Sequence, residues 1–564
     1  MPQTHEYDAI VVGSGITGGW AAKELCEAGL KTLVLERGRM VEHGKDYVGE
    51  HKANWELPFR NRGDRRLYDD EYFIQSKCYA FDEATKHFFV NDKENVYHYD
   101  EDKEFRWIRG YHLGGRSLMW ARLCWRWSDL DFEANARDGH GVDWPIRYED
   151  IAPWYDYVET FAGISGQAEG LPQVPDGKFL PPMEMSIAER HVKDRIAETY
   201  SDRMMTIGRC AVLTREHNGR APCHYCGSCQ RGCSTGSYFS SLSATLPAAW
   251  RTGNLTVRTD SIVDSITHNN ERGRASGVRV IDANTLETFE FKSRVIFLCA
   301  STLGSTYIML NSTSPRFPNG FANGSGELGH NLMDHHFGVG ASGIVPGFTD
   351  KYHRGNRPNG VYVPRYQNLD AKTRRKDYLR GFGTQGSASR QGWQDRYTGA
   401  GIGVDLKEHL REPGPWKMRL GGFGEMLPRH DNYIDLDLDR VDKWGLPILR
   451  VHCTFGENEA AMKKSMMQET AEMLETVGLE DVRMHDEHHP PGFAIHEMGT
   501  ARMGRDPKTS VLNGWNQCHE CDNVFVTDGA CMTSSACQNP SITYMALTAR
   551  ACNHAVEQMK KGAI

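Results

Sequence analysis

The hydrophobic positions near the start of the chain predict a strand, a helix and a second strand in close succession. Residues 9–12 are apolar without interruption, as expected of a parallel strand that is covered on both faces. A helix is expected over residues 20–28, with Gly29 ending it, and a second strand over residues 32–36. A unit of this kind predicts an α/β fold of Rossmann type with a parallel sheet.

Three glycines and one acidic residue give this unit the pattern of a dinucleotide site. Gly13 allows a tight turn, Gly15 allows a pyrophosphate to approach the backbone, and Gly18 allows the helix to pack closely on the strand. The free N–H groups at the helix N-terminus face the phosphates, and Glu36 can accept hydrogen bonds from a ribose. The pattern by itself does not distinguish NAD from FAD.

Further along the chain, short alternating segments predict a run of strands at 255–257, 262–268, 275–280, 288–292 and 295–299. A hairpin-rich insert before a strand that ends at Cys299 suits a nucleotide fold of the FAD type. Residues 354–421 are rich in Gly, Arg and aromatic side chains and show little periodicity, so we expect strands and loops of a substrate domain there.

Composition and charge narrow the class of protein. Lys and Arg number 66 and Asp and Glu number 74, which gives a net charge of −8 without a basic run. This balance disfavours nucleic acid or an anionic membrane as a partner. We expect no transmembrane helix, because no apolar stretch reaches about 18 residues. We also expect no signal peptide, so the chain would fold in the cytoplasm and reach the periplasm only with a partner that carries an export signal.

Four of the 15 cysteines lie close together, at Cys223, Cys226, Cys229 and Cys233. Thiolates spaced as C-x2-C-x2-C-x3-C can all reach one small inorganic core, and the first three share the spacing of a bacterial ferredoxin. Structural zinc usually takes two pairs that a longer loop separates, and a loop without any cofactor is the third alternative. We predict an iron–sulfur cluster here, whereas the isolated C-x2-C at 518–521 is expected to be structural.

The last 70 residues carry the most specific motifs. They contain His496-Glu-Met-Gly-Thr, Asp528-Gly529 and Gln-Asn539-Pro-Ser541. Together with the N-terminal glycines, the Leu-Gly114-Gly115 turn and the segment 329–335, these motifs resemble those of the glucose–methanol–choline (GMC) oxidoreductases. The resemblance covers essentially the whole chain.

The resemblance implies an FAD-binding domain with an interleaved α+β substrate domain. Residues 1–45, 105–150, 210–330 and 490–564 would form the first, and residues 46–104, 151–209 and 331–489 the second. It also implies non-covalent FAD, because Met119 stands where the related pyranose oxidases carry a linking His. Besides the first turn and Glu36, the residues expected to contact FAD are Gly114, Gly115, Ser117, Met119, Asp528, Gly529, Asn539 and Ser541.

By the same resemblance, His496 and Asn539 would be the catalytic pair. Oxidation of an alcohol removes a hydroxyl proton and a hydride, and an imidazole with a pKa of about 6.5 is a suitable base. Asn539 can bond the substrate oxygen, and the helix that follows, expected from Ser541 onward, would point its N-terminus toward the flavin. His335, His488 and His489 match no such motif and are expected to be ordinary core or surface histidines.

The cysteine pattern also resembles that of the sugar dehydrogenases of this family that hold a [3Fe–4S] cluster on a C-x5-C-x3-C spacing. Cys223, Cys229 and Cys233 fit that spacing, and the extra thiol of Cys226 leaves [4Fe–4S] open. A flavin with a cluster implies electron transfer to an external acceptor, and therefore a dehydrogenase and not an oxidase. The expected partners are a small export subunit and a cytochrome c-type subunit.

Among these dehydrogenases the chain is most similar to the glucoside 3-dehydrogenases. This similarity implies oxidation of the C3 hydroxyl of a glucoside or related sugar to a keto sugar. FAD glucose dehydrogenases that act at C1 and gluconate 2-dehydrogenases are alternatives. A non-catalytic electron-transfer flavoprotein is a further one, which the intact His496 and Asn539 pair disfavours.

Overall fold

The strand–helix–strand unit predicted at the N-terminus forms in the computed structural model, which describes residues 4–564 except 272, 354, 393–395 and 397–400. β1 (Thr4–Val12) and β2 (Thr32–Leu35) are parallel neighbours, and α1 (Ile16–Glu27) connects them. The helix begins earlier than predicted because Gly18 and Gly19 lie inside it. A Cβ on Gly18 would lie 2.0 Å from the carbonyl oxygen of Gly13, so this close approach requires glycine.

The largest sheet extends this unit. Its other strands are β7 (Leu255–Arg258), β8 (Ser261–Asn269), β9 (Arg274–Asp282), β10 (Thr288–Leu298), β18 (Gln517–Cys518) and β19 (Cys521–Val526). The order β18-β19-β10-β1-β2-β7 has five parallel strands from β19 to β7, with β18 antiparallel at the edge. This confirms the predicted Rossmann-like architecture.

The run of strands predicted between 255 and 299 is assembled differently from the expected series of hairpins. The two segments predicted at 288–292 and 295–299 are one strand, β10, whose first half pairs with β9 and whose second half pairs with β19. The segment predicted at 255–257 is β7, which pairs with β2 in the parallel part of the sheet. Two of the expected hairpins do form, one between β8 and β9 and one between β9 and the first half of β10.

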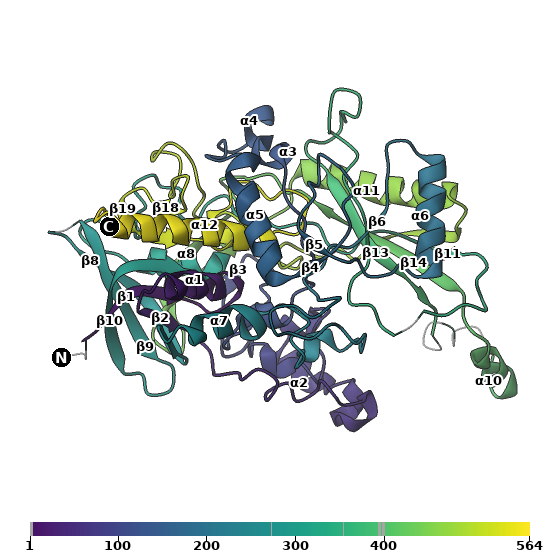
Figure 1. Cartoon of the computed structure of the whole chain (residues 1–564), viewed down its shortest axis with the longest axis horizontal. Helices are drawn as coiled ribbons and strands as arrows, with labels where there is room; N and C mark the ends of the chain where they lie inside the picture. Colours follow the sequence, from purple (N-terminus) through teal and green to yellow (C-terminus); the bar gives the residue numbers. More distant parts are fainter. Residues whose placement is uncertain (1–3, 272, 354, 393–395, 397–400) are drawn as a thin grey trace.

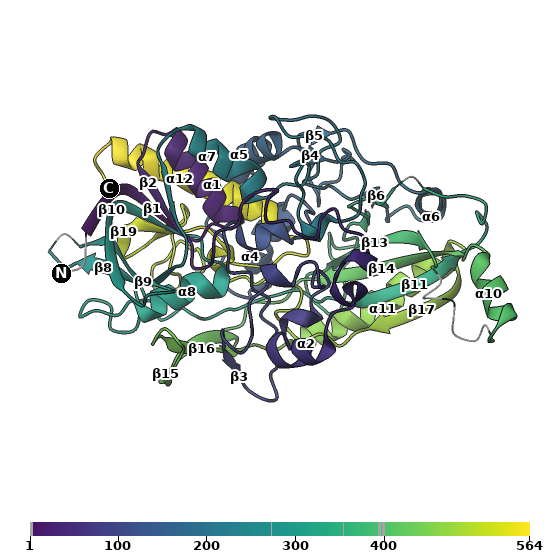
Figure 2. The same ribbon diagram turned by 90° about the horizontal axis from the view of Figure 1, so that it is seen from below.

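Helices cover the parallel sheet and explain its apolar strands. α1 packs with α5 (Tyr148–Ala162), α7 (Leu246–Arg251) and α12 (Ser541–Lys560) on one face, whereas the β8–β9 hairpin and α8 (Thr302–Asn311) lie on the other (Figure 2). Ala9 and Val11 of β1 belong to one hydrophobic cluster, and Ile10 and Val12 belong to another. The uninterrupted apolar run is therefore buried on both faces.

A second sheet forms the other half of the molecule (Figure 1). Its strands are β6 (Thr206–Ile207), β11 (Val339–Val345), β12 (Val361–Val363), β13 (Phe382–Arg390), β14 (Trp416–Gly424) and β17 (Glu480–Asp486), all antiparallel in the order β17-β11-β14-β13-β12-β6. α6 (Ile187–Thr199) and α11 (Glu457–Thr476) share one hydrophobic cluster with Trp416, Met418 and Leu420 of β14. Because side chains alternate along a strand, Arg419, Gly421 and Phe423 face the other way.

Smaller elements complete the fold. They are α2 (Arg65–Glu71), β3 (His98–Tyr99), α3 (Asp129–Phe132), α4 (Ala134–Asp138), β4 (Ile164–Ser165), β5 (Phe179–Leu180), α10 (Val404–Arg411), β15 (Tyr433–Val441) and β16 (Pro447–His452). α10 lies in the segment 354–421, where only strands and loops were expected, and residues 354, 393–395 and 397–400 of that expectation lie outside the described residues.

The expected division into an FAD-binding and a substrate domain stays a prediction. α5 lies mostly in a segment assigned to the substrate domain, yet it packs against α12 of the nucleotide half. Within the described part of the chain, none of the helices combines the length and the apolar character needed to cross a membrane.

Candidate active site

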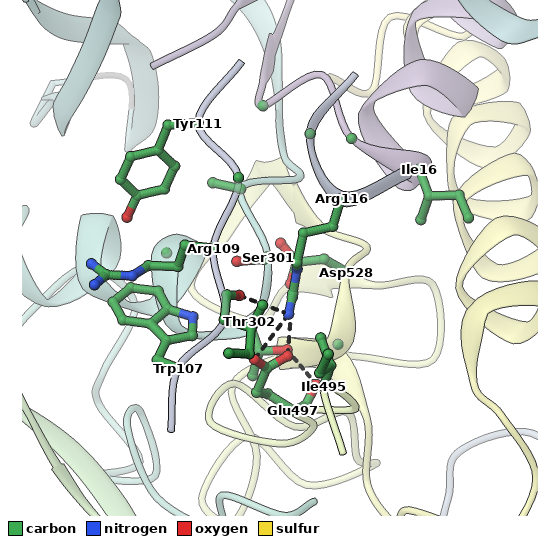
Figure 3. Close-up of a pocket in the computed structure, with 18 of the residues that line it drawn as sticks. Ile16, Trp107, Arg109, Tyr111, Arg116, Ser301, Thr302, Ile495, Glu497 and Asp528 are labelled. Atoms are coloured by element: carbon green, nitrogen blue, oxygen red, sulfur yellow. Dashed lines mark hydrogen bonds and ion pairs between the residues drawn. The ribbon is translucent and has the colours of Figure 1, made fainter. Parts of the chain in front are cut away.

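A large cavity connects the N-terminal glycine turn with the C-terminal motifs. It encloses about 2230 Å³ of space, its opening included. Gly13, Gly15 and Glu36 line it at one end, and His496 and Asn539 line it at the other. Figure 3 shows side chains from both ends of the sequence converging on this space, among them Ile16, Arg116 and Asp528.

The three glycines of the first turn occupy the places that the pattern assigns to them. Gly13 has a φ of +94°, and a Cβ there would lie 2.4 Å from the carbonyl oxygen of Cys299. A Cβ on Gly15 would meet no atom within 4 Å, so the turn is open at the N-terminus of α1. This open backbone beside a helix N-terminus fits a pyrophosphate. Gly18 lies behind the turn and does not line the cavity.

Glu36 is held firmly at the cavity wall. Its carboxylate accepts hydrogen bonds from the backbone N–H and hydroxyl of Ser14, at 3.1 and 2.5 Å, and from the backbone N–H of Gly38 at 2.9 Å. Burial raises the pKa of Glu36, whereas these hydrogen bonds oppose that shift. The carboxylate is thus positioned to accept from a ribose, and that contact stays a prediction.

The second glycine turn faces the first across the cavity. Gly114 donates its N–H to the hydroxyl of Ser14 at 2.9 Å, and a Cβ on Gly115 would lie 3.6 Å from the Cα of Gly15. Gly115, Ser117 and Met119 line the cavity, whereas Gly114 lies behind them.

Two charged residues that were not predicted as site residues join this turn to the loop that carries His496. Arg116 forms two parallel hydrogen bonds with the Glu497 carboxylate, both 3.0 Å long (Figure 3). Glu497 is only 2% exposed, and its carbonyl oxygen accepts from the hydroxyl of Thr302 at 2.5 Å. Arg116 is half-buried, whereas a buried carboxylate such as Glu497 is uncommon, and the sequence carried no signal for it beyond its position next to His496.

Asp528 lies close to this pair, and Gly529 and Ser541 line the same part of the cavity. Its carboxylate accepts from the hydroxyl of Ser305 at 2.5 Å and from the backbone N–H of Ala530 at 3.0 Å. Burial raises the pKa of Asp528 to about 6.

His496 is the centre of a hydrogen-bond chain at the inner end of the cavity. Its Nδ1 lies 2.9 Å from Nδ1 of His335, and Nε2 of His335 lies 3.1 Å from the carbonyl oxygen of Ser535. Since a carbonyl can only accept, His335 carries its proton on Nε2 and accepts at Nδ1. His496 therefore donates from Nδ1, and its Nε2 lone pair is available as a base.

The amide of Asn539 completes the chain. Its Nδ2 lies 3.4 Å from Nε2 of His496, which is long for a hydrogen bond, and its Oδ1 accepts from Nε2 of Gln385 at 2.5 Å. A hydroxyl oxygen placed beside the imidazole could contact both the Nδ2 and the Nε2 atoms. Gln385 lies on β13, in a segment whose weak periodicity carried no signal for this contact.

The structure corrects the expectation that His335 is an ordinary core histidine. The ring is buried and orients His496, and the preceding residue, Asp334, holds the loop by accepting from the backbone N–H groups of Gly492 and His496. Burial raises the pKa of Asp334 to about 7. The resemblance of residues 329–335 to a family motif was the available signal. His488 is exposed beside Asp486, and His489 bonds Glu487.

The environment of His496 also departs from the expected unperturbed base. Burial lowers its pKa well below the ordinary value of 6.5, and the neighbouring His335 and Arg116 lower it further. The ring is consequently neutral at neutral pH, the state in which it can accept a proton.

The four clustered cysteines lie in one loop, residues 223–233, which we call the cysteine loop. Cys226 is exposed, whereas Cys223, Cys229 and Cys233 are half-buried. The backbone N–H of Tyr225 donates to Sγ of Cys223 at 3.4 Å. Among the described residues, no three His, Cys, Asp or Glu side chains are arranged to hold a metal ion, so the iron–sulfur cluster stays a prediction.

The isolated pair Cys518 and Cys521 is buried where β18 and β19 pair. The thiol of Cys521 donates to Oδ1 of Asn523 at 3.3 Å. Both cysteines are part of the sheet edge, in keeping with the structural role expected for them.

The chain is similar to several oxidoreductases along its whole length. It is 29% identical to 2-methyl-1,2-propanediol dehydrogenase of Mycolicibacterium austroafricanum, over 96% of this chain and 94% of that one. It is 24% identical to the fructose dehydrogenase large subunit of Gluconobacter japonicus, over 99% of both chains. Pyridoxine 4-oxidase from Mesorbium loti has a similar structure, with a TM-score of 0.60 over 97% of this chain and 98% of that one, at 16% identity, a likeness of fold alone.

Two family models, both described as GMC oxidoreductase, match residues 7–337 and 428–548, which together are most of the chain. The matched segments contain the nucleotide turn, His496 and Asn539. The chain therefore belongs to the GMC oxidoreductases, an enzyme family that uses FAD and acts on CH–OH groups.

Proposed function

We propose that this protein is an FAD-dependent dehydrogenase that oxidises a secondary hydroxyl of a sugar, with His496 as the base. The observation that carries the proposal is the hydrogen-bond chain from His335 through His496 and Asn539 to Gln385. It presents one proton acceptor and one hydrogen-bond donor to the same point of the cavity, which is what an alcohol needs.

FAD, when bound in this cavity, supplies the acceptor for the hydride of the substrate carbon. Nε2 of His496 takes the hydroxyl proton, and Nδ2 of Asn539 donates to the substrate oxygen. His335 holds the tautomer of His496 and accepts from its Nδ1–H while the ring is protonated. The alcohol thereby loses one proton and one hydride and becomes a ketone.

The residues around the cavity fit FAD without a covalent link. The open turn at Gly15 suits the pyrophosphate, and Glu36 suits the ribose. Ser541 begins α12 at the cavity, so the N-terminus of this 20-residue helix faces the cavity and would stabilise negative charge that develops on a flavin bound there. Met119, at the position of the linking His of related oxidases, is a thioether that forms no such bond.

We further propose that electrons leave toward the cysteine loop. Trp120 lines the cavity and packs against the same hydrophobic cluster as Cys223 and Cys233. Arg122 also lines the cavity, and its charge interacts with Cys229. Trp120 and Arg122 thus connect the cavity wall with the half-buried thiols, whose chemistry suits an iron–sulfur cluster, [3Fe–4S] on three of them.

Transfer through this loop requires an acceptor outside the chain. One relative, the fructose dehydrogenase large subunit, is by its name one chain of an assembly. We propose a cytochrome c-type acceptor subunit and a small subunit that exports the folded enzyme to the periplasm. An electron-transfer flavoprotein without its own catalysis is disfavoured, because the proton acceptor and the donor amide are both in place.

For the substrate, we propose a glucoside that is oxidised at C3. The names of two relatives, fructose dehydrogenase large subunit and gluconate 2-dehydrogenase flavoprotein, point to sugars and sugar acids, whereas 2-methyl-1,2-propanediol dehydrogenase points to a smaller alcohol. A methyl glucoside separates oxidation at C3 from oxidation at C1, because its anomeric hydroxyl is blocked.

The test is turnover of methyl α-glucoside with an artificial electron acceptor, followed by NMR of the product. A 3-keto glucoside is expected. Turnover of free glucose but not of the glucoside would replace the proposal with a C1 dehydrogenase, and turnover of small diols alone would remove sugars as substrates.

A further inference from the structure

A groove on the open face of the second sheet meets the active-site cavity. It encloses about 560 Å³, its opening included, and it shares Phe337, Gln385 and Phe423 with the cavity. The ring of Phe423 lies 5.5 Å from that of His496, measured between centroids. The groove therefore begins beside the catalytic base and continues over β13 and β14, on the face that α6 and α11 do not cover.

The groove is deep at Gly421 because this residue has no side chain. This residue lies in the middle of the sheet, opposite Gly340 of β11 and Gln385 of β13. A Cβ there would meet only one atom within 4 Å, the carbonyl oxygen of Val339 at 3.8 Å. By contrast, a Cβ on the adjacent Gly422 would lie 2.1 Å from Sδ of Met466, on the helix side. Packing thus requires glycine at 422 but not at 421, where its effect is to leave space for a ligand.

The walls of the groove carry groups that bind hydroxyls. Arg419 pairs with Glu487, which also accepts from Nε2 of His489 at 2.9 Å. His485 lines the same groove, and its buried Nε2 has no hydrogen-bond partner among the described residues. A buried ring nitrogen without a partner is uncommon, and a ligand hydroxyl would satisfy it.

Aromatic rings form the side of the groove that is closest to the cavity. The rings of Phe337 and Phe423 lie 5.7 Å apart and are steeply inclined to one another. Aromatic faces beside ion-paired side chains suit a ligand with an apolar ring face and a polar rim, which is the character of a sugar ring. A purely apolar ligand would leave the buried Nε2 of His485 without a hydrogen-bond partner, whereas a sugar hydroxyl would provide one.

We infer that this groove is a second sugar subsite, which holds the second ring of a glycoside while the first ring reacts at His496. The inference rests on the proposed function and deepens it, because it names glycosides of two sugar rings as the preferred substrates. Arg419, Glu487 and His485 bind the hydroxyls of the second ring, and Gly421 gives that ring its space.

Sucrose and methyl α-glucoside provide a matched pair of probes, because both carry an α-glucosyl ring with a blocked anomeric carbon. In the wild type, kcat/KM for sucrose should exceed that for methyl α-glucoside by about ten-fold, the effect of one or two hydrogen bonds to charged groups. Gly421→Leu should fill the groove and remove this advantage; because the new side chain would also lie beside Gln385, the readout is the ratio of kcat/KM for the two sugars, which should fall to about one. Gly421→Ala is the control, because one methyl group fits.

Calorimetric binding of sucrose adds a readout that needs no turnover, and Arg419→Ala repeats the test should Gly421→Leu fail to retain FAD. Arg419 is exposed at the groove wall, so its replacement is expected to weaken sucrose binding and leave methyl α-glucoside binding unchanged. Equal losses for both sugars would overturn the subsite. A wild type that oxidises methyl α-glucoside without preferring sucrose would overturn the subsite and leave the proposed function intact, whereas a wild type that neither binds nor oxidises either sugar would overturn both.

Discussion

Gln385 and Asn539 join the second sheet to the candidate active site, since Nε2 of Gln385 donates to Oδ1 of Asn539 at 2.5 Å. An amide group presents an oxygen on one side and an N–H2 on the other. By occupying the oxygen, Gln385 turns the N–H2 of Asn539 toward His496 and the substrate. A residue of the second sheet thereby fixes the orientation of the amide that we propose to contact the substrate oxygen.

Replacement of Gln385 by Glu should reverse that polarity. A carboxylate cannot donate to Oδ1, so the Asn539 amide would turn its N–H2 toward residue 385 and its oxygen toward the substrate. We expect the rate of flavin reduction to fall by about a hundred-fold in Gln385→Glu. In Gln385→Ala the Asn539 amide can adopt either orientation, so the rate should fall by only about ten-fold. Stopped-flow reduction measures both variants. A Glu variant as fast as the Ala variant would contradict this role.

Replacement of His335 tests its control of the His496 tautomer. His335→Phe keeps a buried ring but removes the acceptor for the Nδ1–H of His496. Flavin reduction should fall by about ten- to a hundred-fold with FAD retained, the usual cost of losing an orienting partner. His496→Ala, which removes the base itself, should be slower still. If the His335→Phe enzyme reduces its flavin at the wild-type rate, the His335 ring contributes only to packing.

The depressed pKa of His496 predicts a flat pH profile. A base whose pKa lies well below 6.5 stays unprotonated as the pH falls through that value, so flavin reduction should hold steady from about pH 8 to about pH 6. The charged groups and imidazole nearest to the ring are Arg116, Glu497 and His335, and Asp334 holds its loop.

Because burial raises the pKa of Asp334 to about 7, Asp334→Asn is the necessary control. A loss of rate near neutral pH that disappears in this variant belongs to the carboxyl of Asp334. Asp528, with a pKa of about 6, needs the same control, and a loss centred at 6.5 that persists in both Asp334→Asn and Asp528→Asn would show that His496 titrates normally.

The side chain at position 119 predicts how the flavin leaves the protein. Met119 lines the cavity and offers no atom for a covalent bond to FAD. Acid precipitation should therefore release a yellow supernatant, measured by its absorbance. Colour retained in the washed pellet would mean that another side chain forms the link.

The cysteine loop predicts distinct effects of two similar substitutions. If Cys223, Cys229 and Cys233 hold a [3Fe–4S] cluster, the oxidised protein should give an EPR signal. Cys226→Ser should leave that signal intact, since Cys226 is exposed and lies outside the C-x5-C-x3-C spacing, whereas Cys229→Ser should abolish it. An EPR-silent oxidised protein that contains iron would favour [4Fe–4S], and one without iron would exclude a cluster.

The parts of this protein that local sequence determines could be predicted from the sequence. Gly13 and Gly18 follow from backbone geometry within a few residues, and α12 was expected at the bounds that it has, Ser541–Lys560. The merging of two predicted strands into β10 could not be foreseen, because its two halves pair with different partners, β9 and β19, that lie far apart in the sequence.

The missed residues of the site act through contacts between distant segments. His335 and His496 are 161 positions apart, and Gln385 and Asn539 are 154 apart. No periodicity or spacing reports such a pair, and a buried His or Gln is found more often in a core than in a catalytic site. The groove could not be predicted from the sequence either. Gly421 and Gly422 are the same residue type, and only the folded strand shows that they face opposite sides of the sheet.

The placement of β19 and α12 has a consequence for how the enzyme matures. β19 completes the parallel sheet beside β10, and α12 packs on α1, so β19 and α12 close a compartment whose other wall, β1 and α1, is synthesised about 500 residues earlier. A nascent chain that still lacks residues 521–560 has neither Asp528 and Asn539 nor the final helix. Such long-range closure is slow and exposes apolar surface meanwhile. The cavity for the cofactor is therefore complete only after residues 521–560 have been synthesised and have packed against β10 and α1.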